Sequence, residues 1–101
     1  MDTTNVTATQ RIFRYEVPVD DRWHVVELRG GEVLHVATRE RPDVVEFWAL
    51  HDERQPSRKP SFLVIGTRQP VPPDATYQGT ALAADGRLVW HLFERTPERP
   101  S

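Results

Sequence analysis

The sequence has no cysteine and only one lysine among its 101 residues. The absence of cysteine excludes disulfides, thiol nucleophiles, cysteine-ligated zinc and iron–sulfur clusters. Neither sign of charge dominates, because 13 basic residues oppose 15 acidic ones and leave a formal net charge of −2. A chain so close to neutral has no general electrostatic attraction to nucleic acid or to acidic lipid.

Long apolar runs are also missing. The longest strongly apolar run, residues 62–65, is much shorter than the roughly 20 residues that a membrane-spanning helix needs. The first ten residues contain no basic stretch followed by an apolar run, so they do not read as a secretory signal. We therefore expect a cytoplasmic protein with one β-domain at residues 11–95, between flexible tails at 1–10 and 96–101.

No segment shows a sustained helical period, and short apolar segments alternate with turn signals instead. Residues 12–17 alternate apolar and charged side chains, which is typical of a half-buried strand. Gly30-Gly31 and Asp85-Gly86 each predict a hairpin turn. We predict an all-β fold, a small sandwich or partly open barrel of about seven mostly antiparallel strands with little or no helix. The predicted strands are residues 12–17, 23–28, 33–38, 44–50, 62–67, 76–82 and 88–93.

Three of these predicted strands are apolar on both faces. In the strand at 44–50, for example, Val45 and Phe47 face one way, whereas Val44 and Trp48 face the other. A two-layer β-domain covers only one face of each sheet, so we expect a second copy of the chain to cover part of the other face. The alternative is that the loops at 51–60 and 68–75 fold over it. The expected interface residues are Val44, Trp48, Leu63, Ile65, Val89 and Phe93.

Residues that could carry catalysis are few. His35 and His91 lie inside predicted strands, and we expect both to be partly buried and hydrogen-bonded. No histidine pair has the spacing of a metal motif, so we expect no metal and no cofactor. Glu27 and Glu46 interrupt apolar strands, and the strand period predicts that each points to solvent. No serine lies in a nucleophile pattern and no phosphate-binding glycine motif is present.

A site for a small anion is the sharper hypothesis. Gly66-Thr67 and Gly79-Thr80 bracket a proline-rich loop. Backbone amides beside these glycines can approach a phosphate closely. The alternative is that the glycines only allow the strands to bend or bulge. Tryptophans and arginines can stack on and clamp a nucleotide, although large aromatic side chains are mostly buried. The candidate ligand-binding residues are Arg39, Arg41, Thr67, Arg68 and Trp48.

Several strings carry a resemblance: FRYEVPVDD at 13–21, LHVA at 34–37, VEFWAL at 45–50, GTRQPVP at 66–72, YQGTA at 77–81 and LVWHLFE at 88–94. Together they resemble a family of small uncharacterised proteins of tailed bacteriophages and prophages. The resemblance covers residues 12–94 and rests on strand cores and turns. Family members often carry Gly-Thr-Gly-His-Pro where this chain has the residues at 66–70, so any role of that histidine does not carry over. The resemblance implies a phage-encoded intracellular accessory protein.

Residues and resemblance together favour a self-associating β-module that binds a host protein or a small, nucleotide-like anion, with counter-defence as its role. A structural or assembly protein of the phage particle is the alternative. A small enzyme that uses His35, His91 and a carboxylate is the least favoured function, because no spacing supports it.

Overall fold

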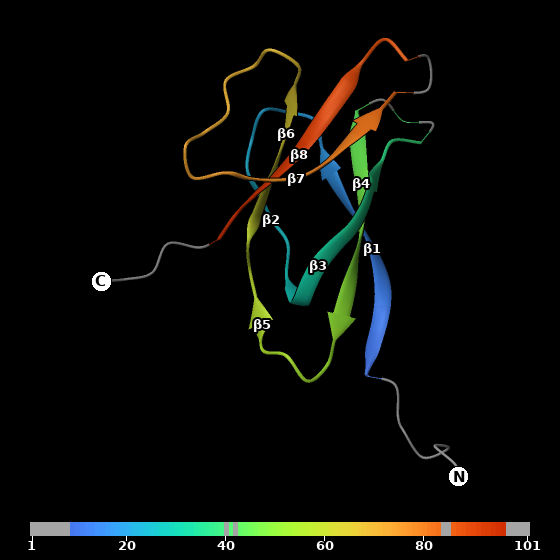
Figure 1. Cartoon of the computed structure of the whole chain (residues 1–101), viewed down its shortest axis with the longest axis vertical. Helices are drawn as coiled ribbons and strands as arrows, with labels where there is room; N and C mark the ends of the chain where they lie inside the picture. The colour runs from blue at the N-terminus through green and yellow to red at the C-terminus, as the bar shows by residue number, and fades with distance from the viewer. Residues whose placement is uncertain (1–8, 40, 42, 84–85, 97–101) are drawn as a thin grey trace.

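The computed structural model describes residues 9–39, 41, 43–83 and 86–96. Across these residues the chain forms eight strands and no helix, in two four-stranded antiparallel sheets (Figure 1). The predicted all-β fold is therefore confirmed. The strands are β1 (Gln10–Pro18), β2 (His24–Val25), β3 (Leu28–Ala37), β4 (Val44–Asp52), β5 (Ser57–Arg58), β6 (Ser61–Gly66), β7 (Thr76–Leu82) and β8 (Val89–Arg95).

The first sheet has the order β1-β4-β3-β5. β1 pairs with β4 without a register shift, from Gln10↔Asp52 to Pro18↔Val44. Alternation along β1 places Tyr15 and Val17 against the core and sends the intervening charged side chains to the opposite face. That opposite face, which points away from the second sheet, is called the outer face of the first sheet below.

The second sheet has the order β2-β6-β8-β7, and β8 pairs with both β6 and β7. The predicted hairpin between the last two long strands is present, since β7 and β8 pair from Thr76↔Glu94 to Leu82↔Val89. In its turn, Gly86 has a φ of 74° and its N–H donates to the Ala83 carbonyl at 2.8 Å. Asp85 of the predicted turn lies outside the described residues.

The core lies between the two sheets and joins strands far apart in the sequence. Phe47 of β4 and Phe62 of β6 are both fully buried, with ring centroids 4.6 Å apart. Val17, Val64 and Leu92 pack into the same cluster. Burying each such side chain stabilises the fold by roughly 1.5–3 kcal/mol, so this cluster holds the sheets face to face.

Gly30 and Gly31 do not form the predicted hairpin turn. β3 runs through both, and their φ angles of 76° and 96° belong to an irregular strand whose register with β4 shifts on either side of Val33. The physical reason is Arg58, whose guanidinium donates to the Gly30 carbonyl at 2.8 Å and to the Gly31 carbonyl at 3.3 Å. A Cβ on Gly31 would lie 2.8 Å from Arg58 Nη2, so glycine makes room for this contact.

The predicted strand at residues 23–28 is divided between the two sheets. Only His24 and Val25 form β2, which pairs with β6 in the second sheet. The chain then crosses to the first sheet, where β3 begins at Leu28. This segment therefore connects the two layers instead of pairing with the strand that follows it.

The polar segment predicted as a loop at 51–60 contains the end of β4 and the whole of β5. Asp52 ends β4, and its Oδ1 accepts hydrogen bonds from the backbone N–H of Arg54 at 3.0 Å and from its Nε at 3.3 Å. These hydrogen bonds from Arg54 lower the pKa of the Asp52 carboxyl. The chain then turns, and Ser57 and Arg58 pair with the start of β3.

The predicted tails fall mostly on residues 1–8 and 97–101, which lie outside the described residues. The part of the chain that the structure describes contains no helix long and apolar enough to cross a membrane.

Candidate functional site

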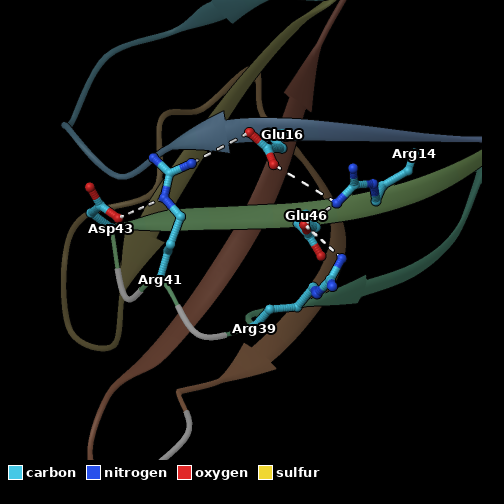
Figure 2. A network of polar contacts seen from close by, with 6 residues as sticks. All are labelled: Arg14, Glu16, Arg39, Arg41, Asp43 and Glu46. Carbon is cyan, nitrogen blue, oxygen red and sulfur yellow. Dashed lines mark hydrogen bonds and ion pairs between the residues drawn. The ribbon is translucent and has the colours of Figure 1, made fainter.

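Charged side chains gather at one end of the outer face of the first sheet. β1 contributes Arg14 and Glu16, β4 contributes Glu46, and the segment after β3 contributes Arg39 and Arg41 (Figure 2). Strand pairing brings them together, because Glu16 is the partner of Glu46 across β1 and β4. These five residues are called the arginine–glutamate cluster below.

Glu46 is the buried centre of this cluster. Its side chain is only 6% exposed, and its Oε2 accepts a hydrogen bond from Arg14 Nη1 at 2.6 Å. Arg39 Nη1 lies 3.6 Å from the same oxygen. Oε1 is buried and has no hydrogen-bond partner among the residues that the structure describes. A buried carboxylate oxygen without a donor is costly, so Oε1 raises the free-energy cost of burying Glu46.

The other ion pairs of the cluster, and the pair that Arg41 forms with the neighbouring Asp43, are long and exposed. Glu16 lies 3.9 Å from Arg14 and 3.9 Å from Arg41, and Asp43 lies 3.7 Å from Arg41. Such exposed pairs stabilise a protein little, by about 0–1 kcal/mol each. The guanidinium groups are therefore free to exchange these contacts for stronger ones with a bound anion.

An open cavity of about 230 Å³ lies over the cluster and is lined by all five of its residues together with Val44. Pockets for drug-sized ligands measure roughly 300–1,000 Å³. The cavity over the cluster is therefore suited to a ring or a small acid group, with any larger part of a ligand left outside.

The structure divides the five residues predicted to bind a ligand into two groups. Arg39 and Arg41 line the cavity over the cluster, and Trp48 lies on the same outer face as the cross-strand partner of Arg14. Thr67 and Arg68 belong to the turn after β6 in the second sheet, and Thr67 lines a different cavity.

The three tryptophans also occupy separate surroundings. Trp48 is half-buried on the outer face, with the His35 ring 5.7 Å away at a tilt. Trp23 lies beneath the guanidinium of Arg95, whose Cζ is 4.1 Å from the ring centroid. Trp90 packs against the core. Only Trp48 is placed to add an aromatic surface beside the cluster.

Sequence reasoning missed the most important residue of the site. Glu46 was predicted to point to solvent, and this is wrong, because the residue is only 5% exposed. Arg14 and Arg39 approach it from β1 and from the segment after β3, which makes its burial tolerable. The signal available in the sequence was a carboxylate that interrupts an apolar strand. Glu27, by contrast, is exposed as predicted, and Ser57 Oγ donates to it at 2.6 Å.

A row of hydroxyl groups around His91 crosses the second sheet. His91 Nε2 lies 3.0 Å from Thr67 Oγ1, and His91 Nδ1 lies 3.0 Å from Thr80 Oγ1, which in turn contacts the Tyr77 hydroxyl. His91 is half-buried and hydrogen-bonded, as predicted, whereas His35 is exposed. In a nucleophile–base pair a third group, usually a carboxylate, orients the histidine; here a threonine occupies that place. The row therefore lacks the acid of a catalytic triad.

The turn that carries Arg68 holds this residue in the left-handed region, at a φ of 80°. A residue with a side chain loses about 1–2 kcal/mol of folding free energy by adopting this angle. Glycine adopts the angle without strain, but it loses about 0.5–1 kcal/mol because its unfolded chain has more conformational entropy. We expect Arg68→Gly to raise the free energy of unfolding by about 0.5–1 kcal/mol, measured by urea denaturation. A loss of stability in this variant would contradict the prediction.

The six residues predicted to form a subunit interface differ in how much surface they retain. Within the single chain, Val44, Leu63 and Ile65 are only 7%, 8% and 4% exposed. These three have little area left to bury against a partner. The other three, Trp48, Val89 and Phe93, are half-buried and keep some accessible surface.

Among the residues that the structure describes, no group of three or more histidine, aspartate or glutamate side chains is placed to hold a metal ion. A comparison with protein-family models matches residues 8–101 to a domain of unknown function, DUF7352. Comparisons with curated proteins and with solved structures find no match.

Proposed function

The chain belongs to the DUF7352 family, and we propose that it is a binding module whose arginine–glutamate cluster takes a small anionic ligand. The family is one of unknown function, so the proposal depends on the site alone. The observation that carries it is the Glu46 carboxylate, buried inside a cavity lined by three arginines and left with one oxygen unpartnered.

The arginines of the cavity, and not its net charge, favour an anion. Three arginines and two glutamates line the cavity, and Asp43, 3.7 Å from Arg41, cancels the formal surplus of one positive charge. The side chains of Arg39 and Arg41 are 62% and 65% exposed, and their ion pairs within the cluster are 3.6 Å and 3.9 Å long. A planar guanidinium binds phosphate or carboxylate oxygens through two parallel hydrogen bonds, which are stronger than these long contacts.

Trp48 and the unpartnered Glu46 oxygen favour a ligand that is more than a bare anion. Trp48 is half-buried and keeps some accessible aromatic surface on the same face, on which a planar ring can stack. Glu46 Oε1 has no hydrogen-bond partner among the described residues, and as a carboxylate oxygen it can be satisfied only by an N–H or O–H donor. An anion that also carries a ring and a donor, such as a nucleotide, meets both conditions.

The biological setting is proposed from the sequence resemblance. We take the protein to be phage-encoded and to act in the cytoplasm of a bacterial host, where sequestering a small anionic signal would blunt a defence response. Contact with an acidic segment of a host protein would use the same arginines. Self-association also remains a proposal, with Trp48, Val89 and Phe93 as the residues that retain surface for it.

The test of this function is binding of anions to the wild-type protein and to an Arg39→Ala, Arg41→Ala double variant. We expect pyrophosphate and nucleoside monophosphates to raise the thermal midpoint, since ligand at 100 times its Kd adds about 2.7 kcal/mol to the free energy of unfolding. The double variant should bind at least tenfold more weakly by calorimetry, because charge-assisted hydrogen bonds contribute about 1.5–3 kcal/mol each.

The matched control is Arg11→Ala, which removes an equally exposed arginine whose ion pair with Glu53 lies outside the cavity. This variant should bind as the wild type does. If neither pyrophosphate nor any nucleoside monophosphate stabilises the wild-type protein, or if the control loses as much affinity as the double variant, the proposed function is wrong.

A further inference from the structure

We propose that the ligand is a guanine nucleotide, whose base edge is recognised by the hydrogen-bonded pair of Arg14 and Glu46. This inference rests on the proposed function and specifies its ligand. The geometry of the pair carries it: Arg14 Nη1 donates to Glu46 Oε2 at 2.6 Å, and Glu46 Oε1 is buried without a partner.

Glu46 Oε1 is closed to solvent in this structure, so a ligand reaches it only when the exposed Arg39 moves away from Glu46. The pair then offers that ligand a row of one donor followed by two acceptors. The donor is the Arg14 guanidinium, which has further N–H groups beyond the one bound to Glu46. The acceptors are the two oxygens of Glu46, since an ionised carboxylate only accepts. A ligand that complements this row must present one acceptor followed by two donors.

Guanine presents this complement on its Watson–Crick edge, where the O6 acceptor is followed by the N1–H and N2–H₂ donors. Adenine and cytosine each place an acceptor next to their amino group, and that acceptor would face a Glu46 oxygen. Uracil has a single donor between two acceptors. Hypoxanthine lacks the 2-amino group and would leave one Glu46 oxygen unpartnered. Among the common bases, guanine alone satisfies every position of the row.

The burial of Glu46 makes the row selective. Its side chain is 6% exposed, so water does not easily replace a missing ligand donor. Some sites bury a polar group that only the correct ligand can hydrogen-bond. Such sites discriminate against analogues that lack the matching group, by up to roughly 10⁴-fold. A cavity of about 230 Å³ is of a size to hold the base, whereas the ribose and phosphate lie outside.

The phosphate then meets the remaining cations. Arg39 and Arg41 come from the segment after β3, whereas Arg14 comes from β1 (Figure 2). The two side chains are mostly exposed, so they can reach a phosphate at the mouth of the cavity. Base recognition and phosphate binding are therefore assigned to different arginines, and they can be separated by substitution.

The test is calorimetric titration of the wild-type protein with the monophosphates of guanosine, inosine, adenosine and cytidine. We expect guanosine monophosphate to bind at least tenfold more tightly than each of the other three. Inosine monophosphate is the matched ligand, because it differs from the guanosine compound only by the 2-amino group. This arm needs no variant, so it stands even if substitutions at the buried site impair folding.

Glu46→Gln supplies the second arm. The amide replaces one acceptor with a donor, so we expect the affinity for guanosine monophosphate to fall at least tenfold while the affinity for pyrophosphate changes less than threefold. If all four nucleotides bind equally and the Arg39→Ala, Arg41→Ala variant abolishes that binding, guanine recognition is wrong and the proposed function still stands. Absence of binding by every nucleotide and by pyrophosphate would overturn both.

Discussion

Replacing Arg58 with alanine is expected to lower the free energy of unfolding by about 3 kcal/mol. Arg58 Nη1 donates to Glu94 Oε2 at 2.7 Å, and the side chain of Glu94 is only 10% exposed. Without the guanidinium, this carboxylate stays buried without its countercharge, which is the costly way to break a buried ion pair. The carbonyls of Gly30 and Gly31 lose a donor as well. Denaturation in urea, followed by tryptophan fluorescence, measures the effect.

The size of this effect follows from what Arg58 connects. It lies in β5 of the first sheet, it holds the irregular stretch of β3, and its carboxylate partner lies in β8 of the second sheet. Arg11→Ala is the control: its ion pair with Glu53 is 3.8 Å long with side chains 65% and 58% exposed, so its loss should cost less than about 1 kcal/mol. Similar costs for the two variants would show that the Arg58 pair carries no special stability.

A double variant separates the pair from the rest of the site. Replacing a buried ion pair with apolar residues of similar volume is often neutral or stabilising, so Arg58→Met with Glu94→Leu should be more stable than Arg58→Ala alone. The two residues therefore contribute to the fold as a unit. Their coupling is the difference between the double variant and the sum of the single variants.

The strands that were predicted correctly depend on local signals. β7 was predicted at its observed bounds, residues 76–82, because a proline-rich loop precedes it and a turn follows it. β1 was predicted from strict alternation, which survives in the structure because one face of the strand meets the core and the other does not. Alternation and turn residues act within a few positions of the chain, so one sequence is enough to read them.

The features that were missed depend on contacts across long stretches of sequence. Two adjacent glycines fit a hairpin turn and an irregular strand equally well. The guanidinium of Arg58, 27 residues beyond Gly31, decides between them in this chain. β5 was missed for a related reason, because Ser57 and Arg58 form a strand only where β3 is there to pair with them.

The same limit applies to the candidate site. The sequence predicts Arg39 and Arg41 as anion-binding residues because a guanidinium suits phosphate and carboxylate, and the structure places both at the cavity. Alternation correctly put Glu46 on the face away from the core, but it does not reveal whether that face is covered. The cover comes from Arg14, 32 residues earlier, and from Arg39, so the buried carboxylate became visible only in three dimensions.

Gly79→Ala is expected to destabilise the protein by about 3 kcal/mol, because Gly79 of β7 lies close against Val36 of β3. A Cβ on Gly79 would lie 2.5 Å from Cγ2 and 3.0 Å from Cβ of Val36, closer than packed carbon atoms come. Val36 cannot easily retreat, because it is 6% exposed and its backbone is paired with Phe47. Overpacking of this kind typically costs about 1–3 kcal/mol, and we expect the upper end. Urea denaturation again supplies the measurement.

Val36→Ala in the same chain should relieve the overlap. Alone, this substitution removes two buried methyl groups and should cost about 2 kcal/mol. Combined with Gly79→Ala, it leaves space for the new methyl group, so the double variant should be at least about 1 kcal/mol more stable than additivity predicts. Gly86→Ala is the control, because no described atom beyond its chain neighbours lies within 4 Å of its added Cβ, whereas its φ of 74° opposes alanine. Val36→Ala should therefore not restore the stability lost in Gly86→Ala. If the costs of Val36→Ala and Gly79→Ala are simply additive, the contact with Val36 is not the reason that position 79 requires glycine.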